Sequence, residues 1–198
     1  MDIREPEIKR NEILILDDDN FNTHNVCIVT GSGTGIGRAT AIAAAVNNLM
    51  TVGLDVNETE GKKTQKMARE MGGQMIFVKT DLCRDAEIEY AVSEAAKLGS
   101  IKFVANIAGI QHIDSIDSFP MEKYDYMQKL MLRAPFYLSK LTMPHIRKSS
   151  DGVGAIGNMA SIHAHISTLN KPVYNITKFG LRALTQSIAA EGEGKIRS

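Results

Sequence analysis

The fold is decided by residues 26–37, V-C-I-V-T-G-S-G-T-G-I-G. The apolar half, Val26–Thr30, predicts a buried strand, and the alanine-rich segment Ile36–Asn47 predicts a helix directly after it. Glycines let the backbone between them turn tightly and approach a pyrophosphate, which the start of a helix favours electrostatically. The motif alone is also compatible with a tight turn that binds nothing. If it binds a dinucleotide, we expect contacts from Gly31, Ser32, Gly33, Thr34, Gly35, Ile36 and Gly37.

Apolar strand-like runs and helical patterns alternate along the rest of the chain. This alternation is typical of an α/β protein with a doubly wound parallel sheet that helices cover on both faces. Residues 25–198 are therefore expected to form one nucleotide-binding domain. Further strands are predicted at Thr51–Leu54, Met75–Lys79, Phe103–Asn106 and Ala155–Met159, and further helices at Glu58–Met71, Asp85–Lys97, Met121–Arg147 and Pro172–Glu191.

Both ends of the chain depart from this pattern. Residues 1–24 precede the first strand, as a mobile extension or as an arm that packs on the same subunit or a neighbour. At the other end, a charged turn near Lys195–Ser198 leads toward a further strand. A sheet that stopped at its fifth strand would leave an apolar edge unpaired. We therefore expect that the last strands and the C-terminal part of the domain are missing from this chain.

The composition excludes several classes of protein. The 198 residues include 23 basic and 23 acidic side chains, which gives no field for nucleic acid. Two cysteines make no disulfide framework, and the charged N-terminus has no apolar signal core. No run approaches the length of a membrane span. We expect a cytoplasmic protein without nucleic-acid or membrane partners and without a metal site.

An acidic residue ends the second predicted strand. Asp55 lies eighteen residues past Gly37, where a carboxylate can accept hydrogen bonds from ribose hydroxyls and repel a 2′-phosphate. Because no arginine or lysine flanks it, NAD is expected rather than NADP. An ordinary solvated aspartate at a strand end is the alternative. Asp81, after the third strand, is expected near the adenine end, although alone it would be taken for a helix cap.

Ser161, Tyr174 and Lys178 carry the predicted chemistry. Tyr174 and Lys178 lie in a stretch with helical periodicity, and their spacing of four puts phenol and ammonium on one face. A cation beside a phenol favours the phenolate, so Tyr174 can donate or accept a proton. Ser161 can hold a carbonyl or hydroxyl oxygen beside it. Such a pair also occurs in helices by chance, so its meaning depends on the other motifs.

Together these motifs resemble the short-chain dehydrogenase/reductase family over residues 25–198. The resemblance implies a Rossmann-type fold, a nicotinamide cofactor and hydride exchange with an alcohol (CH–OH) or ketone. It also implies that Tyr174 is the acid/base, that Ser161 orients the substrate oxygen, and that Lys178 binds the nicotinamide ribose. The segments that carry it are Thr30–Gly37, Asp55, Asp81-Leu82, Asn106–Gly109, Ser161 and Tyr174–Lys178. The cofactor contacts it adds to the glycine turn are Asp55, Asp81, Leu82, Asn106, Ala108, Gly109, Tyr174 and Lys178.

Within the family the chain is most similar to the 3-hydroxybutyrate dehydrogenases. The resemblance implies that Gln111, His163 and Lys171 bind the substrate carboxylate while Ser161 and Tyr174 hold its reacting oxygen. An amide, an imidazole and an ammonium that converge on one point suit a small anion. Taken singly, each residue has another interpretation: His163 could cap a loop, Lys171 could be solvated, and Gln111 could bond the backbone. The segments behind this similarity are Ala108–His112, Phe119-Pro120, Ala160–His163 and Asn170–Tyr174.

Two positions depart from the family. Ile107 replaces the second asparagine of N-N-A-G, and Met131 stands where the family's tetrad asparagine marks a helix distortion. In members of the family, a free main-chain carbonyl at this distortion holds a water molecule next to the lysine. Pro135 has no N–H and cannot bond the Met131 carbonyl, so we hypothesise that Pro135 preserves the water site. Alternatively, Met131 simply packs in the core and the proton relay is impaired.

The leading interpretation is an NAD-dependent oxidation of a small 3-hydroxy acid, with 3-hydroxybutyrate giving acetoacetate. One rival is a reductase of another ketone or alcohol, and another is a cofactor-binding homologue that has lost turnover. The resemblance further implies a homodimer or homotetramer, with the helices around Met121–Arg147 and Pro172–Glu191 at an interface.

Overall fold

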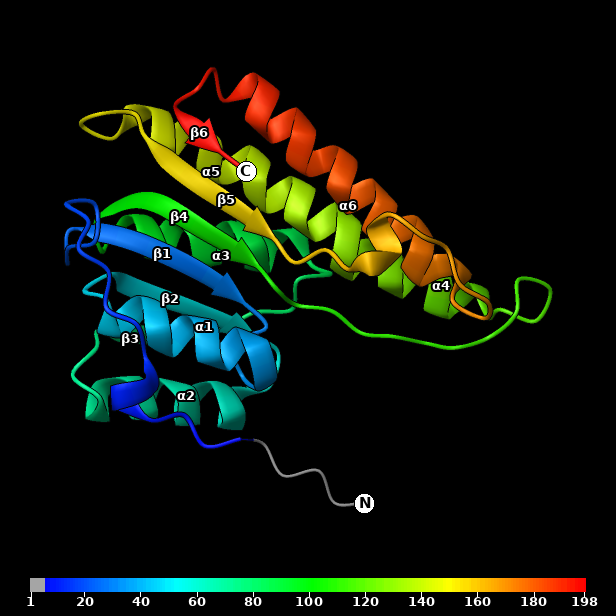
Figure 1. The fold of residues 1–198 in the computed structure, drawn as a ribbon, viewed down its shortest axis with the longest axis horizontal. Helices are drawn as coiled ribbons and strands as arrows, with labels where there is room; N and C mark the ends of the chain where they lie inside the picture. The colour runs from blue at the N-terminus through cyan, green and yellow to red at the C-terminus, as the bar shows by residue number, and fades with distance from the viewer. Residues whose placement is uncertain (1–5) are drawn as a thin grey trace.

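Six parallel strands form the centre of the molecule, in the order β3-β2-β1-β4-β5-β6 (Figure 1). The computed structural model describes residues 6–198. The prediction of a doubly wound, Rossmann-type parallel sheet is confirmed, since helices cover both faces. The strands are β1 (Asn25–Thr30), β2 (Met50–Asp55), β3 (Met75–Lys79), β4 (Ser100–Asn106), β5 (Gly154–Asn158) and β6 (Ile196–Arg197).

Side chains of β1 alternate between two apolar cores, as a period of two requires. Val26 and Ile28 join the core under α3, α5 and α6, whereas Cys27 and Val29 join the core under α1 and α2. Because both faces are buried, the strand is apolar throughout, which explains its continuous hydrophobic run. The helices are α1 (Gly35–Val46), α2 (Glu58–Glu70), α3 (Asp85–Ala96), α4 (Met121–Gln128), α5 (Ala134–Lys148) and α6 (Pro172–Glu191), with short 3-10 turns at Arg10–Glu12 and Ile162–Ala164.

The predicted helix Met121–Arg147 is not regular throughout. A π-helical turn, Lys129–Arg133, separates α4 from α5, and the Ala134 N–H bonds the carbonyl of Lys129. The predicted helical segment is therefore present, and it contains a local distortion between its two α-helical parts. Apolar periodicity is similar in α- and π-helical turns, so this local widening leaves little trace in the pattern.

The sheet extends beyond the five strands given definite bounds from sequence. Ile196 and Arg197 of β6 pair with Gly154 and Ala155 of β5. A strand of two residues is too short for a periodic signal. None of the helices in the described part of the chain is both long and apolar enough to cross a membrane.

The segment before β1 packs on the same subunit. Ile8, Ile13 and Phe21 lie against the core beneath α1 and α2. The Asn47 side chain, just after α1, accepts the N–H of Leu16 at 2.7 Å and donates to the carbonyl of Leu14 at 3.0 Å. Residues 1–5 of the predicted extension lie outside the described residues.

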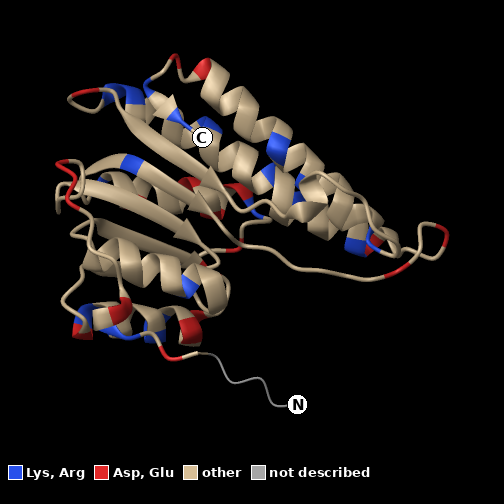
Figure 2. Cartoon of the chain, viewed as in Figure 1, with Lys and Arg blue, Asp and Glu red and all other residues tan. Residues whose placement is uncertain are grey.

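Charge is unevenly distributed over the helices. Figure 2 shows acidic and basic residues mixed along α2, whereas most of α6 carries neither. A helix with few charges and several exposed apolar side chains is a candidate for contact with another surface. On α6 these exposed side chains include Ile176 and Phe179.

Lys102 of β4 is buried at the amino-terminal end of the sheet. Its Nζ donates to Asp151 Oδ2 at 2.7 Å and to Asn20 Oδ1 at 2.8 Å, which joins the segment before β1 to the turn before β5. The hydrogen bond from this ammonium lowers the pKa of Asp151 to about 2.

This depressed pKa predicts an acid-dependent loss of stability. Because the pKa of Asp151 falls from 3.8 to about 2 on folding, its stabilisation is present above the unfolded value and is lost as pH falls through the folded one. Thermal unfolding followed by circular dichroism between about pH 5 and about pH 2 should show a smaller loss of Tm in Asp151→Asn than in the parent. Asp17→Asn, at an exposed position, should match the parent; equal losses in all three proteins would contradict the assignment.

Candidate functional site

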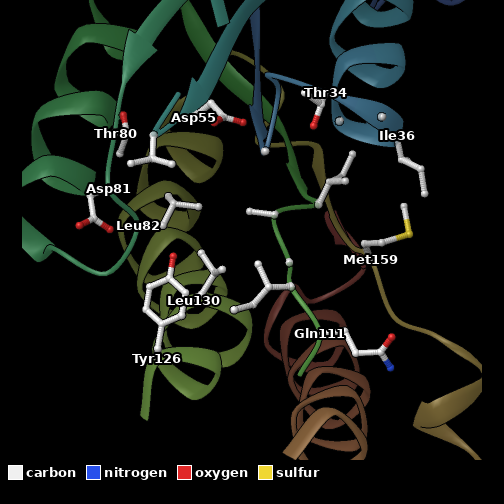
Figure 3. A pocket seen from close by; sticks show the side chains of 18 of the residues that line it. Thr34, Ile36, Asp55, Thr80, Asp81, Leu82, Gln111, Tyr126, Leu130 and Met159 are labelled. Carbon is white, nitrogen blue, oxygen red and sulfur yellow. The ribbon is translucent and has the colours of Figure 1, made fainter. Parts of the chain in front are cut away.

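A cavity of about 540 Å³ opens at the carboxyl ends of β1, β2, β4 and β5 (Figure 3). In a doubly wound sheet this is where a crevice forms, because connections from neighbouring strands lead to opposite faces. Its walls are mainly main chain and apolar side chains, with a few polar groups. Lining residues foreseen from sequence are Gly31, Thr34, Gly35, Ile36, Gly37, Asp55, Asp81, Leu82, Ala108, Gly109, Gln111, Tyr174 and Lys178.

Two backbone turns meet at the floor of this cavity. Thr30 Oγ1 accepts the N–H of Ile107 at 2.9 Å and that of Ala108 at 3.1 Å. Gly31 has a φ of +67°, and a Cβ there would lie 2.9 Å from the Ala108 Cα. The turn after β1 therefore requires glycine for both its conformation and its close approach to the turn after β4.

The Asp55 carboxylate is held in place by main-chain donors. Oδ2 accepts the N–H of Gly33 at 2.8 Å, and Oδ1 accepts the N–H of Asn57 at 2.9 Å. Each oxygen retains a lone pair for a further donor. A fixed carboxylate beside a glycine-rich helix start suits a ribose and a pyrophosphate, so these groups fit a dinucleotide.

Asp81 follows β3, next to the end of β2, where the Thr80 N–H donates to the Asp55 carbonyl at 2.9 Å. Its Oδ1 accepts the N–H of Cys83 at 2.9 Å, while the Asp81 N–H donates to Glu87 at 2.7 Å. Asp81 is not the N-cap of α3, which is Arg84. Both Asp81 and Leu82 line the cavity, and Figure 3 shows the Leu82 side chain pointing into it.

Lys178 is buried beside Tyr174. Its side chain donates to the carbonyl of Met159 at 2.6 Å, and Nζ lies 5.4 Å from the centre of the Tyr174 ring. Burial lowers the pKa of Lys178, because the charged form loses water. This arrangement keeps an amine one helical turn from a phenol, at the edge of the cavity.

Ser161 is linked to Tyr174 through His163. Ser161 Oγ lies 3.1 Å from His163 Nδ1, and the His163 ring meets the Tyr174 ring edge-on, with centres 5.3 Å apart. The second nitrogen of His163, Nε2, lies 2.9 Å from Thr168 Oγ1. Both imidazole nitrogens therefore have hydroxyl partners.

The predicted anion-binding residues are only partly brought together. Gln111 lines the cavity, whereas Ser161, His163 and Lys171 are not among its lining residues. A hydrogen bond of 2.9 Å from the Asp114 N–H to the Asn170 carbonyl brings the loop that carries Gln111 beside the residue before Lys171.

Three predicted cofactor contacts lie beneath the cavity lining. Ser32 is fully buried, with no hydrogen-bond partner found for Oγ among the described residues. Gly33 contacts Asp55, as described above. The Asn106 side chain donates to Asn158 Oδ1 at 2.9 Å and so joins β4 to β5. Their positions indicate that they support the groups that face the cavity.

Sequence reasoning missed several lining residues. The side chains of Tyr126 and Leu130 reach the cavity from α4 and the π turn, although neither residue was singled out in the sequence (Figure 3). Their spacing of four places them on one helix face, but nothing in the sequence says that this face meets the glycine turn. The others are Val56, Thr80, Ile107, Ile110 and Met159.

The π turn lies directly behind Tyr174. Met131, within this turn, is buried in a cluster with Met127 and Val173, and Tyr174 packs against that cluster. Pro135 follows in the first turn of α5 and is also buried. A helix distortion therefore occurs at the position where the family asparagine is replaced, with Pro135 one turn away.

Comparison with known proteins supports a family assignment. A family model described as short chain dehydrogenase matches residues 25–197. The chain is 30% identical over 166 residues to an uncharacterized oxidoreductase of Thermotoga maritima, covering 84% of this chain and 65% of that one. It is 31% identical over 170 residues to a D-beta-hydroxybutyrate dehydrogenase of Cupriavidus necator (83% and 63% covered). It is 30% identical over 173 residues to a probable galactose dehydrogenase of Rhizobium meliloti (86% and 67% covered). The chain thus spans about 65% of the length of the first of these relatives.

The close contact at the cavity floor yields a stability prediction. Gly31→Ala should destabilise the protein by about 1–3 kcal/mol more than Gly35→Ala, as measured by urea unfolding. Both glycines have positive φ, but a Cβ at Gly35 meets no heavy atom within 4 Å. The control thus carries the backbone strain without the clash. Equal losses in the two variants would show that the approach to Ala108 is not tight.

Proposed function

Because this chain belongs to the short-chain dehydrogenase family, we propose that it forms the cofactor-binding and catalytic part of an NAD-dependent oxidoreductase. The proposed reaction exchanges a hydride with a small 3-hydroxy acid, with 3-hydroxybutyrate and acetoacetate as the leading pair. The observation that carries the proposal is the buried Lys178 amine beside Tyr174 at the edge of a cavity with a glycine turn and Asp55.

Asp55 would bind the adenine ribose. Its two oxygens already hold Gly33 and Asn57, so the carboxylate has a defined direction and spare acceptor capacity for two hydroxyls. A 2′-phosphate at the same place would meet a negative charge, which favours NAD over NADP. When bound, the nicotinamide supplies the hydride acceptor.

Tyr174 would act as the general acid/base. In the oxidation direction its phenolate takes the proton of the substrate hydroxyl, while the Ser161 hydroxyl holds the same oxygen. Lys178 places a positive charge beside the phenol, and the Met159 carbonyl holds Nζ in position. With one N–H used in this way, the ammonium retains donors for a ribose hydroxyl.

Gln111, His163 and Lys171 would bind the substrate carboxylate. The similarity to a protein named D-beta-hydroxybutyrate dehydrogenase supports this choice. Since both nitrogens of His163 have partners, His163 can bind a carboxylate only by exchanging one of them, Ser161 at Nδ1 or Thr168 at Nε2. Lys171 and Gln111 need no such exchange, because no hydrogen bond is found for their side chains among the described residues.

A neutral alcohol is the second candidate substrate. The similarity to a probable galactose dehydrogenase favours it, because that name indicates a substrate without a carboxylate. Reduction of acetoacetate with NADH, compared with reduction of neutral ketones with NADH and oxidation of galactose with NAD, separates the two. A protein that binds NAD but neither reduces nor oxidises any of these compounds would be a non-catalytic homologue.

Self-association is also part of the proposal. Phe136 on α5 is 57% exposed, and a groove between α5 and α6 runs past it to Gly180 and Leu184. Since α6 carries few charges, a second copy could cover this face, which gives a homodimer or homotetramer.

Removal of one hydroxyl tests the proposed chemistry. Tyr174→Phe should lower kcat for 3-hydroxybutyrate oxidation by at least about 100-fold, as expected for loss of a general acid/base. The affinity for NADH, measured by titration calorimetry, should change little. Tyr90→Phe removes an exposed hydroxyl on α3 and should match the parent. Equal turnover in parent and Tyr174→Phe would exclude the mechanism.

A second substitution tests the role of the helix distortion. Pro135→Ala restores an N–H that can bond the Met131 carbonyl, so it should lower turnover while leaving the affinity for NADH unchanged. Pro144→Ala is the matched control, because Pro144 is an exposed proline within the same helix. If Pro135→Ala retains parental turnover, the distortion has no part in proton transfer.

A further inference from the structure

Arg38 is a charged side chain buried beneath the glycine turn. Its side chain is only 2% exposed, between α1 and α2. Nη2 donates to the carbonyl of Gly33 and pairs with Glu60 of α2, and Nε donates to Thr64 Oγ1 at 3.0 Å. Burying a guanidinium is costly unless its donors are satisfied, and a tight turn alone does not need one. Its contacts therefore point to a specific task.

The contacts of Arg38 belong to a closed ring of five residues. The Gly33 carbonyl accepts from Arg38, and the Gly33 N–H donates to Asp55 Oδ2. On the other side, Arg38 pairs with Glu60, the Glu60 N–H donates to Asn57 Oδ1 at 3.1 Å, and the Asn57 N–H donates to Asp55 Oδ1. Both oxygens of Asp55 are thus held by main-chain groups whose positions depend on the same ion pair.

The Gly33 peptide leaves Asp55 little freedom. A Cβ at Gly33 would lie 2.8 Å from Asp55 Oδ2, so the carboxylate rests directly on the turn. Thr64 Oγ1 lies 3.3 Å from the Gly33 carbonyl and supports it from α2. The hydrogen bond from Arg38 also lowers the pKa of Glu60, which keeps the pair charged.

We propose that Arg38, anchored by Glu60, is a positioning residue that sets the direction of the Asp55 carboxylate and thereby the selectivity for NAD over NADP. The inference rests on the proposed function and deepens it. Arg38 touches neither ribose nor phosphate in this scheme. It acts through Gly33 and through Asn57, so its loss frees the carboxylate to rotate away from a ribose and to tolerate a 2′-phosphate.

The test compares dissociation constants for NADH and NADPH in Arg38→Met and Glu60→Gln by titration calorimetry. In Arg38→Met we expect the Kd for NADH to rise about tenfold, as loss of hydrogen bonds to a charged group predicts. The Kd for NADPH should rise much less, so the ratio of the Kd for NADPH to the Kd for NADH should fall several-fold. Glu60→Gln keeps the guanidinium and should show a smaller change in the same direction. Arg69→Met, an exposed arginine on α2, should keep the parental ratio.

The outcomes separate this inference from the proposed function. If the parent binds neither nucleotide, the proposed function fails, and the inference fails with it. If the parent prefers NADH but both variants keep its ratio, only the role of Arg38 is overturned. Weaker binding of both nucleotides by the same factor, with a lower Tm, would assign Arg38 to folding alone. Should Arg38→Met fail to fold, the ratio in Glu60→Gln decides.

Discussion

Thr30 Oγ1 accepts two main-chain N–H groups from the turn after β4, and this contact joins the carboxyl ends of the two central strands. Without it, the turn after β4 would have two unsatisfied N–H donors at the bottom of a crevice, which is costly in a buried site. Gly31 permits the approach, since a side chain there would strike Ala108. The floor of the cavity, where the turns after β1 and β4 meet, depends on this contact.

The two functional ends of the cavity are stabilised in different ways. At the Asp55 end, a ring of hydrogen bonds through Gly33 and Arg38 holds a carboxylate in a partly exposed position. At the Tyr174 end, a lysine is buried against a single carbonyl, and its lost hydration is only partly replaced. The first arrangement suits the rigid recognition that we propose for Asp55. The second keeps an amine near a phenol, as the proposed proton transfer requires.

The helical segment that packs against Tyr174 is distorted although the asparagine that marks this distortion in the family is replaced. Met131 occupies the marker position and is buried, yet the helix is still distorted over Lys129–Arg133. Pro135, one turn later, has no backbone N–H and so cannot donate to the Met131 carbonyl. This effect on the main chain does not require an asparagine at position 131. The distortion of the main chain is therefore present here without an asparagine at position 131.

Much of this protein could be predicted from sequence because its signals are local. The continuous apolar run Val26–Val29, the glycines before α1, and the four-residue step from Tyr174 to Lys178 each express a rule that acts within a few residues. These rules predicted the strands, the order of the helices and the Tyr174–Lys178 pair, whereas Gln111, His163 and Lys171 were expected only from the resemblance to a family. Only the tertiary structure decided which helix face meets the glycine turn, and for this reason Tyr126 was not predicted to line the cavity. The ring of hydrogen bonds through Arg38 likewise depends on the tertiary structure. Contacts between segments far apart in the chain depend on how whole elements pack, and periodicity reports only that a face is buried, never what covers it.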